Sequence, residues 1–408
     1  MVSGAEAFIP PIAASRRYGS NRGRAAAVSV VMRVLAAVVI AVACAVVAGC
    51  GSGAAPARSP AAAGSAGAVP ASLKVPDGFQ PAAASFVSPA WGVVLGGSGC
   101  TLSRPCRAQL AVTADGGARW SLMRAPAVWL GDGRSGPPQV SQVLFADRAS
   151  GWLYQRYTSS IWATHDGGAS WREITLPGSI HTMAASAHAV YAVAGSQLYT
   201  SPPGRDAWVR VSARTRSGSM TGSILAVWGT SAWFAGGTYL WMTADGGHWA
   251  RYPLHSPGTA YGVPYQLAGI AAASSGNVAL LWGSAQGMYH TVMTVQISSN
   301  SGRTQAQTLK APPPYGDPAA FAVAPGRSGV ILAAAQAPPA DDIYRSASLG
   351  NSWATVTIPD TSGGITLNSL ELMSPAAGCL VVGNPGYGLP GALLQTANAG
   401  QTWYRVRF

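Results

Sequence analysis

One short phrase recurs along this chain of 408 residues and constrains its architecture. The phrase has the form Ser/Thr-x-Asp-x-Gly-x-x-Trp, and its clearest copies read TADGGARW at 113–120, THDGGASW at 164–171 and TADGGHW at 243–249. Weaker copies read SASLGNSW at 346–353 and TANAGQTW at 396–403, and eroded copies read TSPPGRDAW at 200–208 and SSNSGRT at 298–304. A repeat of nearly fixed period arises when similar structural units pack side by side, so it limits the fold more than any single residue does.

The residue types of the phrase suit a tight turn between two strands. An Asp or Asn side chain accepts hydrogen bonds from the backbone N–H groups that follow it. The Gly two residues later adopts a positive φ without a Cβ penalty, and the Trp offers a large apolar face at the start of the next strand. We therefore assign structural roles to Asp115, Gly117, Trp120, Asp166, Gly168, Trp171, Asp245, Gly247, Trp249, Gly350, Trp353, Asn398, Gly400 and Trp403. We expect the Trp rings to be largely buried between strands.

A second pattern precedes each copy of the phrase. It consists of an apolar strand, a turn of small residues and another apolar strand, as in ASFVSPAWGVVLGG at 84–97 and LELMSPAAGCLVVG at 370–383. Alternating runs such as WREITL follow the phrase and mark half-buried strands. Seven such units of four strands fit between about residue 79 and Phe408, at a spacing of roughly 37 to 55 residues. We predict an all-β fold, a seven-bladed β-propeller of four-stranded antiparallel blades, because radial repetition leaves only short protected sheet edges.

The repeated phrase resembles the Asp-box, also called the BNR repeat, of sialidase-like β-propellers. In that family the box is structural and lies on the rim, far from the catalytic centre. Boxes followed by a strand that begins with Trp look closest in kind to exported propellers similar to the photosystem II assembly factor. Those proteins act as scaffolds or assembly chaperones for membrane or envelope proteins. The resemblance covers the whole repeat region, but it implies the fold more strongly than the function, because one fold hosts many activities.

The chain before the repeats predicts export. Residues 33–50, RVLAAVVIAVACAVVAGC, combine a positively charged start with an apolar middle, which is typical of a secretory signal and too short for an ordinary membrane span. The end of this segment resembles the bacterial lipobox, which implies cleavage before Cys50 and acylation of that cysteine. We expect residues 1–49 to be the signal peptide, and Met32 is an alternative start that would make 1–31 a mis-called extension.

The predicted mature chain has two parts. Residues 50–75 comprise the lipidated Cys50 and a flexible linker of Ala, Gly, Ser and Pro, and residues 76–408 form the propeller. This organisation predicts an extracytoplasmic protein anchored to the cell membrane as a lipoprotein.

Three further cysteines occur in the predicted propeller. Cys100 and Cys106 bracket a short loop, and outside the cytoplasm they suit a local disulfide, which would contribute about 2 kcal/mol through loop entropy. A metal site is the alternative, but no His or second cysteine pair lies nearby in the sequence. Cys379 falls at a strand position and suits a buried, inert thiol.

The charge balance is basic, with a formal net charge of +12. Loss of the signal peptide, which carries five Arg and one Glu, leaves 21 basic and 13 acidic residues. Export and the scattered placement of Arg argue against nucleic acid as a partner. Attraction to anionic lipid headgroups or to an acidic cell-wall polymer agrees better with this charge.

The resemblance to sialidases raises the question of catalysis. It implies an Arg-Ile-Pro motif and a Tyr/Glu nucleophile pair, but the chain contains no Arg-Ile-Pro. After the signal only Glu173 and Glu371 remain as glutamates; we expect Glu173 on a solvated strand face and Glu371 on the innermost strand of the last blade. Glycosidases need two carboxyl groups across the scissile bond. A pair drawn from Glu371 and the Asp residues that we expect in loops remains the alternative; these are Asp132, Asp317, Asp341, Asp342 and Asp360.

The six His show no metal-ligand spacing, and His165 and His248 fall inside the repeated turns, where we expect them to be exposed. No metal or cofactor is predicted.

The repeat also predicts where a partner binds. Each phrase joins a third strand to a fourth, so all copies share one face of the ring, and the longer loops share the other. Aromatic and Arg residues are enriched in interface anchors, so we nominate the loop residues Trp129, Arg134, Arg214, Arg216, Tyr261, Tyr265, Tyr315 and Tyr387. The alternative is that they only pack on the rim. We predict a monomeric, membrane-tethered binding, scaffold or assembly module for an envelope protein or polysaccharide, with a secreted sialidase-like glycoside hydrolase as the alternative.

Overall fold

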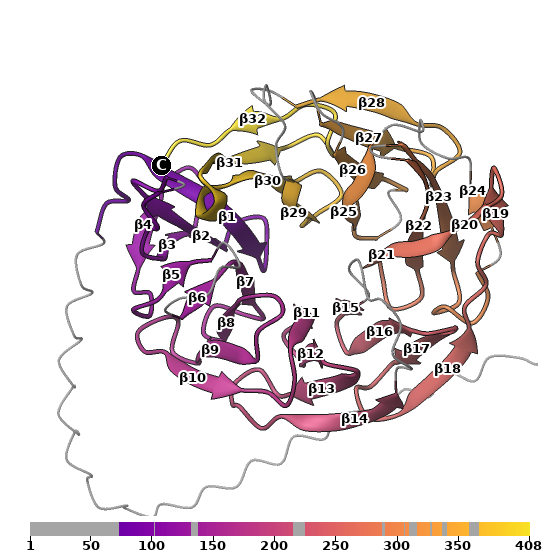
Figure 1. Ribbon diagram of the computed structural model, residues 1–408, viewed down its shortest axis with the longest axis horizontal. Helices are drawn as coiled ribbons and strands as arrows, with labels where there is room; N and C mark the ends of the chain where they lie inside the picture. The colour runs from indigo at the N-terminus through magenta and orange to yellow at the C-terminus, as the bar shows by residue number, and fades with distance from the viewer. Residues whose placement is uncertain are drawn as a thin grey trace, which may run out of the picture. The chain divides into compact units, whose positions relative to one another are not determined.

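The protein is a seven-bladed β-propeller, as the repeat predicts. The computed structural model describes residues 73–101, 103–131, 138–214, 225–287, 290–305, 307–309, 316–326, 329–336, 341–358 and 367–408. Within these residues, seven four-stranded antiparallel sheets form the blades of a ring (Figure 1). Each blade begins at the ring axis with its first strand and ends at the periphery with its fourth.

The blades follow one another along the chain. Blade 1 contains β1 Phe79–Phe86, β2 Gly92–Ser98, β3 Gln109–Thr113 and β4 Ser121–Met123; blade 2 contains β7 Gln142–Phe145, β8 Gly151–Tyr154, β9 Ser160–Thr164 and β10 Arg172–Thr175; blade 3 contains β11 Ile180–Ala185, β12 Val190–Ala194, β13 Gln197–Ser201 and β14 Val209–Arg214; blade 4 contains β15 Leu225–Trp228, β16 Ser231–Gly236, β17 Tyr239–Thr243 and β18 Trp249–Pro253. Blade 5 contains β21 Gln266–Ala272, β22 Val278–Gly287, β23 His290–Ser298 and β24 Gln307–Leu309; blade 6 contains β25 Asp317–Val323, β26 Ile331–Gln336, β27 Asp342–Ser346 and β28 Ala354–Thr357; blade 7 contains β29 Leu367–Leu372, β30 Gly378–Asn384, β31 Leu389–Thr396 and β32 Tyr404–Arg405.

Five short elements lie outside this scheme, in three places. The parallel pair of β5 (Trp129–Leu130) and β6 (Gln139–Val140) lies between blades 1 and 2, and the antiparallel hairpin of β19 (Thr259–Ala260) and β20 (Val263–Pro264) lies between blades 4 and 5. The 3₁₀-helix η1 (Pro385–Tyr387) lies in the loop between β30 and β31. Asp317 and Asp342 are the first residues of β25 and β27, so our placement of these two residues in loops was wrong.

Burial decreases from the middle of each blade to its periphery. The six residues Gly92–Gly97 of β2 are all buried, because neighbouring blades cover both faces of the second strand. In the outer strand β10, Arg172, Glu173 and Thr175 are exposed, which confirms the predicted solvated position of Glu173. The three largest fully buried side chains, Trp152, Trp233 and Tyr191, lie on second strands, where neighbouring blades pack on them.

The ring closes by packing between blades 1 and 7, and no sheet in the described part of the chain mixes strands from both. Val75, before β1, is buried in an apolar cluster with Cys379 and Leu393 of blade 7. From the other end of the chain, the Phe408 ring lies 4.8 Å from that of Phe79 and 4.9 Å from that of Trp120, measured between centroids. The segment that leads into β1 and the C-terminal Phe408 therefore fill this seam between the first and last blades.

The backbones approach closely at the same seam. A Cβ atom added to Gly391 of β31 would collide with the carbonyl oxygen of Pro81 in β1. Gln395 of β31 also donates a hydrogen bond from Nε2 to the carbonyl of Gly116 at 3.3 Å. The last blade thus contacts the first through both backbone and side chains.

Each connection between a third and a fourth strand is named here a repeat turn. The residue that begins it pairs with the first residue of the second strand or lies beside it, for example Thr113 with Gly92 and Thr396 with Gly378. In blade 3 this position is held by Ser201, opposite Val190. The eroded phrase therefore begins at Ser201, one residue later than the sequence alignment predicted.

The antiparallel order gives the ring two different faces. The repeat turns and the connections between first and second strands lie on one face, which we call the turn face. The connections between second and third strands, and those between blades, lie on the opposite face, which we call the loop face.

Candidate functional site

The repeat turns use their own polar groups internally. In blade 2, the Thr164 hydroxyl donates to Asp166 Oδ1 at 2.8 Å and accepts from the Gly168 amide at 2.9 Å. Asp166 Oδ1 also accepts from the Ser170 amide at 2.9 Å. The turns of blades 1, 5 and 7 repeat this arrangement, with Asn at the Asp position in blades 5 and 7. The predicted Asx-type hydrogen bonding is therefore present.

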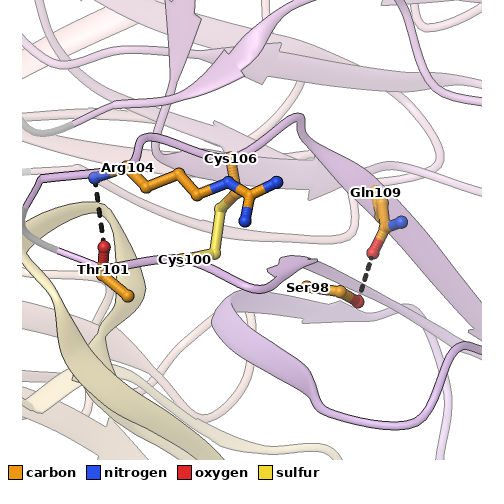
Figure 2. Close-up of a disulfide and its surroundings, with 6 residues drawn as sticks. All are labelled: Ser98, Cys100, Thr101, Arg104, Cys106 and Gln109. Carbon is orange, nitrogen blue, oxygen red and sulfur yellow. Dashed lines mark hydrogen bonds between the residues drawn. A yellow bond between two sulfur atoms is a disulfide. The ribbon is translucent and has the colours of Figure 1, made fainter.

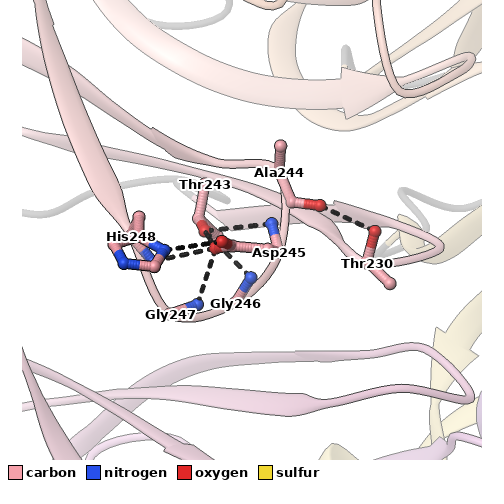
Figure 3. Close-up of polar contacts among 7 residues, drawn as sticks. All are labelled: Thr230, Thr243, Ala244, Asp245, Gly246, Gly247 and His248. Atoms are coloured by element: carbon pink, nitrogen blue, oxygen red, sulfur yellow. Dashed lines mark hydrogen bonds and ion pairs between the residues drawn. The ribbon is translucent and has the colours of Figure 1, made fainter.

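Blade 4 has a shorter version of the turn (Figure 3). The Thr243 hydroxyl accepts from the Gly246 amide at 2.9 Å, and Asp245 Oδ1 accepts from the amides of Gly247 at 2.9 Å and His248 at 2.8 Å. Gly246 has a φ of +76°, and Gly247 is not among the glycines with positive φ. Assigning the positive-φ role to Gly247 was wrong, because the turn is one residue shorter than the others.

These hydrogen bonds keep the turn carboxylates ionised. Those from the Ser170 side chain and amide lower the pKa of Asp166 to about 2, since donors to the charged form stabilise it. The Arg119 amide lowers the pKa of Asp115, and the His248 amide lowers that of Asp245. In return, the hydrogen bond to Asp245 raises the pKa of His248. An acid that must donate a proton near neutral pH needs a raised pKa, so these three carboxyl groups are unsuited to that role.

His165 differs from the expectation that it is exposed. Its Nε2 lies 3.1 Å from Asp206 Oδ1, and only 26% of its side chain and 8% of that of Asp206 are accessible. Asp206 belongs to the repeat turn of blade 3, so this pair connects the turns of blades 2 and 3. His248 is exposed as predicted, with 96% of its side chain accessible.

The Trp rings of the repeat are largely buried, as predicted. Trp403 is 7% exposed, whereas Trp120, Trp171, Trp249 and Trp353 are partly buried and pack against the apolar clusters between blades. These four rings lie at the outer edge of each blade, which leaves each of them partly accessible.

In blade 2 the repeat Trp also connects the blade to its predecessor. Trp171 Nε1 donates to the Arg124 carbonyl of blade 1 at 2.9 Å. Blade 5 has Gln305 at the corresponding position; its Nε2 donates to the Pro253 carbonyl at 3.1 Å, and its Oε1 accepts from the His255 amide at 2.9 Å. We missed Gln305 from the sequence, although SSNSGRTQ aligned with the phrase places it at the Trp position.

Glu371 is held at the seam between the first and last blades. Its Oε2 accepts a hydrogen bond from the Phe86 amide of blade 1 at 3.1 Å. Burial raises the pKa of this carboxyl from 4.5 to about 7, and the Phe86 amide opposes the shift in part. Glu371 pairs with Cys379, which is fully buried as predicted, and burial raises the pKa of that thiol.

The same contact occurs one blade further on with a different residue. Ser85 occupies the position in β1 that Glu371 has in β29, because each pairs with the second residue of the following strand. The Phe145 amide of blade 2 donates to Ser85 Oγ at 3.0 Å. Glu371 therefore satisfies an inner-strand amide of the next blade, as Ser85 does, and this is a structural role.

The loop face of blade 1 contains the predicted disulfide. Cys100 and Cys106 are bonded, with their Cα atoms 5.0 Å apart, and they close a loop that begins after Ser98 (Figure 2). Within it, the Arg104 amide donates to the Thr101 hydroxyl at 3.1 Å. The Arg107 guanidinium carbon lies 4.4 Å from the centre of the Trp129 ring. Arg107 thus covers one face of the Trp129 ring, which we nominated as a contact for a partner.

Two tyrosines on the loop face combine exposure with an unusual backbone. Among the described residues, five residues other than Gly have positive φ. Three of them, Ser301, Leu349 and Ala399, occupy the same place in the repeat turns. The other two are Tyr157 in the β8–β9 loop, with φ +67°, and Tyr261 in the β19–β20 hairpin, with φ +48°. Their side chains are 65% and 89% exposed, respectively.

A groove lies beside the hairpin that carries Tyr261. It measures about 510 Å³, opens on the loop face between blades 5 and 6, and is lined mainly by apolar residues. Val263 and Pro264 of the hairpin form one wall. Tyr265 follows the hairpin; burial and, to a smaller extent, Tyr261 raise the pKa of its hydroxyl.

The structure does not place the remaining predicted site residues. Cys50, Asp132, Arg134, Arg216, Tyr315 and Asp360 lie outside the described part of the chain, as do the side chains of Arg214 and Tyr387. In the described part, no group of three or more His, Cys, Asp and Glu is arranged to hold a metal ion. No helix within these same residues has the length and hydropathy needed to cross a membrane.

Comparison with known proteins supports the fold. No family model and no curated protein matches the chain. Among solved structures, YCF48 bound to D1 peptide matches with a TM-score of 0.50 and 15% identity, over 80% of this chain and 96% of that one. The GH74 xyloglucanase from Xanthomonas campestris matches with a TM-score of 0.51 and 15% identity, over 82% of this chain and 55% of the enzyme. A chain of the COPII outer coat vertex on membranes matches with a TM-score of 0.51 and 11% identity, over 77% and 84% of the two chains. The chain is therefore similar to propellers of unrelated activity, and the likeness shows the fold alone.

Proposed function

We propose that this protein is an exported, lipid-anchored β-propeller that binds an envelope protein or polysaccharide on its loop face and acts as a scaffold or assembly module. The observation that carries this proposal is the difference between the two faces. The repeat turns of the turn face consume their polar groups in internal hydrogen bonds. The loop face presents exposed tyrosines and a groove of about 510 Å³, which are features of interaction sites. The turn face has a smaller apolar pocket of about 350 Å³, which the exposed Leu349 partly lines.

Capture of a binding partner from solubilised envelope by the purified protein tests whether the loop face or the turn face binds it. We expect the triple substitution Arg104→Ala, Tyr157→Ala and Tyr261→Ala, which changes exposed loop-face residues, to abolish capture. A matched variant with Arg119→Ala, His248→Ala and Arg303→Ala changes exposed turn-face residues, and it should retain capture. The reverse pattern would place the partner on the wrong face of this proposal.

The anchor is tested separately. Two observations support it: the lipobox-like end of the apolar segment and the spacer of small residues that follows it. One acyl chain holds a protein only marginally, so stable anchoring implies more than one. Cys50→Ser should move the protein from the membrane fraction to the soluble fraction, and full membrane retention of this variant would refute lipidation at Cys50.

A glycoside hydrolase is the second candidate, and one observation favours it. The pKa of Glu371 is raised to about 7, which is the range of a general acid. Against it, the carboxyl accepts the Phe86 amide in the structural position that Ser85 holds in blade 1. Glycan release by the purified protein that Glu371→Gln abolishes without loss of folding would favour the hydrolase.

A further inference from the structure

Side-chain hydrogen bonds from blade 5 hold the hairpin that forms one wall of the groove between blades 5 and 6. The Ser284 hydroxyl, on β22, donates to the Val263 carbonyl at 2.7 Å. Gln286 Nε2, on the same strand, donates to the Ala260 carbonyl at 3.0 Å. Both strands of the hairpin are therefore fixed to blade 5. A wall that is already ordered binds a partner without the entropic cost of ordering it.

The turn of this hairpin carries strain that the fold alone does not require. Tyr261 and Gly262, with φ of +48° and +82°, occupy the central positions of a two-residue turn of the kind that favours Asn-Gly or Gly-Gly. A bulky residue in this region costs on the order of 1 kcal/mol, and such strain is concentrated at functional sites. Tyr261 is also the most exposed large hydrophobic residue of the described chain, at 89%. The hairpin thus presents a tyrosine to solvent despite a cost that Gly would avoid.

The chemistry of the groove favours a polypeptide over a sugar. Its lining is mainly aliphatic and includes Leu267, Ala285 and Pro318. One carboxylate lines it, that of Asp317, whose Oδ1 accepts a hydrogen bond from the Thr291 hydroxyl at 2.6 Å. Recognition of a sugar needs many converging hydrogen-bonding groups, whereas an aliphatic wall beside a single charge suits an apolar side chain next to a charged one.

We propose that this groove binds an extended peptide segment of a protein partner, with an apolar side chain against Leu267 and Pro318 and an adjacent Lys or Arg paired with Asp317. Tyr261 then packs on the segment from the tip of the hairpin. The chain has an excess of basic residues, so the Asp317 carboxylate is a local site that attracts positive charge. Charge complementarity adds specificity to the apolar contact. This inference rests on the proposed function, because it names the partner of the loop face.

A displayed library of random heptapeptides, selected on the immobilised full chain, tests the inference. We expect the selected sequences to share an apolar residue next to Lys or Arg. For a labelled peptide of that kind, Asp317→Asn should weaken binding by about tenfold in fluorescence polarisation, which corresponds to the loss of one good charged contact. Asp342→Asn is the matched control, because Asp342 begins a strand of blade 6 on the same face and does not line the groove; it should leave binding unchanged.

Tyrosine variants provide an independent test. Tyr261→Gly should weaken binding of the same peptide. Tyr157→Gly, which removes the other exposed tyrosine of positive φ, should leave that binding unchanged. Asp317→Lys should prefer a peptide in which Glu replaces the basic residue.

Absence of enriched peptides, enrichment of acidic peptides, or binding that survives Asp317→Asn would overturn the inference, as would polysaccharide binding that depends on Tyr261 and displaces the peptide. If the peptides fail but envelope capture still depends on the loop face, the proposed function stands and only the groove assignment fails.

Discussion

Glu371 makes the stability of the ring dependent on pH. Its carboxyl joins blade 7 to the Phe86 amide of blade 1, and burial raises its pKa from 4.5 to about 7. The folded state therefore binds this proton more tightly than the unfolded chain does. The stabilisation is fully present below the unfolded pKa of 4.5 and is lost as the pH rises through about 7.

The size of the effect follows from the shift. Each pKa unit corresponds to about 1.4 kcal/mol, so the full shift corresponds to about 3 kcal/mol between acidic and slightly basic pH. Glu371 keeps part of its surface accessible, and solvent screening reduces our expectation to about 2 kcal/mol. Urea denaturation at about pH 5 and about pH 8 measures this difference in the free energy of unfolding.

Substitutions separate the charge from the hydrogen bond. Glu371→Gln keeps an acceptor for the Phe86 amide but does not titrate, so it should abolish this pH dependence and stabilise the protein at about pH 8. Ser85→Ala is the matched control, because it removes the equivalent acceptor of the Phe145 amide without removing a titratable group. It should cost about 1–3 kcal/mol at both pH values, since a buried amide loses its partner. A Glu371→Gln protein with the pH dependence of the unaltered protein would refute the assigned cause.

Three other predictions concern stability. Tyr261→Gly should raise the free energy of unfolding by about 0.5–1 kcal/mol, because Gly relieves the backbone strain at a small cost in unfolded-state entropy; a lower melting temperature would contradict the strain. The double substitution Cys100→Ala and Cys106→Ala should cost about 2 kcal/mol, and a reducing agent should reproduce this loss in the unaltered protein but not in the double variant. Trp403→Ala should cost about 3–5 kcal/mol and Trp353→Ala less, because the first residue is more buried than the second; equal losses in thermal denaturation would show that burial does not set the difference.

The sequence predicts the architecture well because the information is local. Within each repeat turn, the hydroxyl, the Asp or Asn and the Gly lie a few residues apart, and their hydrogen bonds form inside one turn. The number of blades follows from counting turns. The disulfide of Cys100 and Cys106 was also predictable, because the two cysteines are separated by only six positions.

Contacts between blades could not be predicted in the same way. The Phe86 amide and the Glu371 carboxyl lie 285 positions apart, and no local pattern identifies one as the partner of the other. Asp206 interrupts the eroded phrase in blade 3 and pairs with His165 of the preceding turn, although a sequence view places both on exposed turns. The groove is assembled from β20, β21, β22, β23 and β25, so its lining residues come together only when the ring has formed.

Three departures from the repeat lie where blades 4, 5 and 6 meet. Blade 5 replaces the repeat Trp with Gln305, is preceded by the only antiparallel hairpin found between described blades, and has its second strand extended to Gly287. Residues that keep the repeat satisfy the common requirement of every blade, which is to pack against two neighbours. A departure that served stability would be expected to remove strain and fill space. The hairpin instead adds the strained Tyr261, and the extended β22 borders a groove of about 510 Å³. Gln305 joins blades 4 and 5, so stability accounts for that departure. The strained tyrosine and the groove are the departures that the proposed binding role of the loop face would explain.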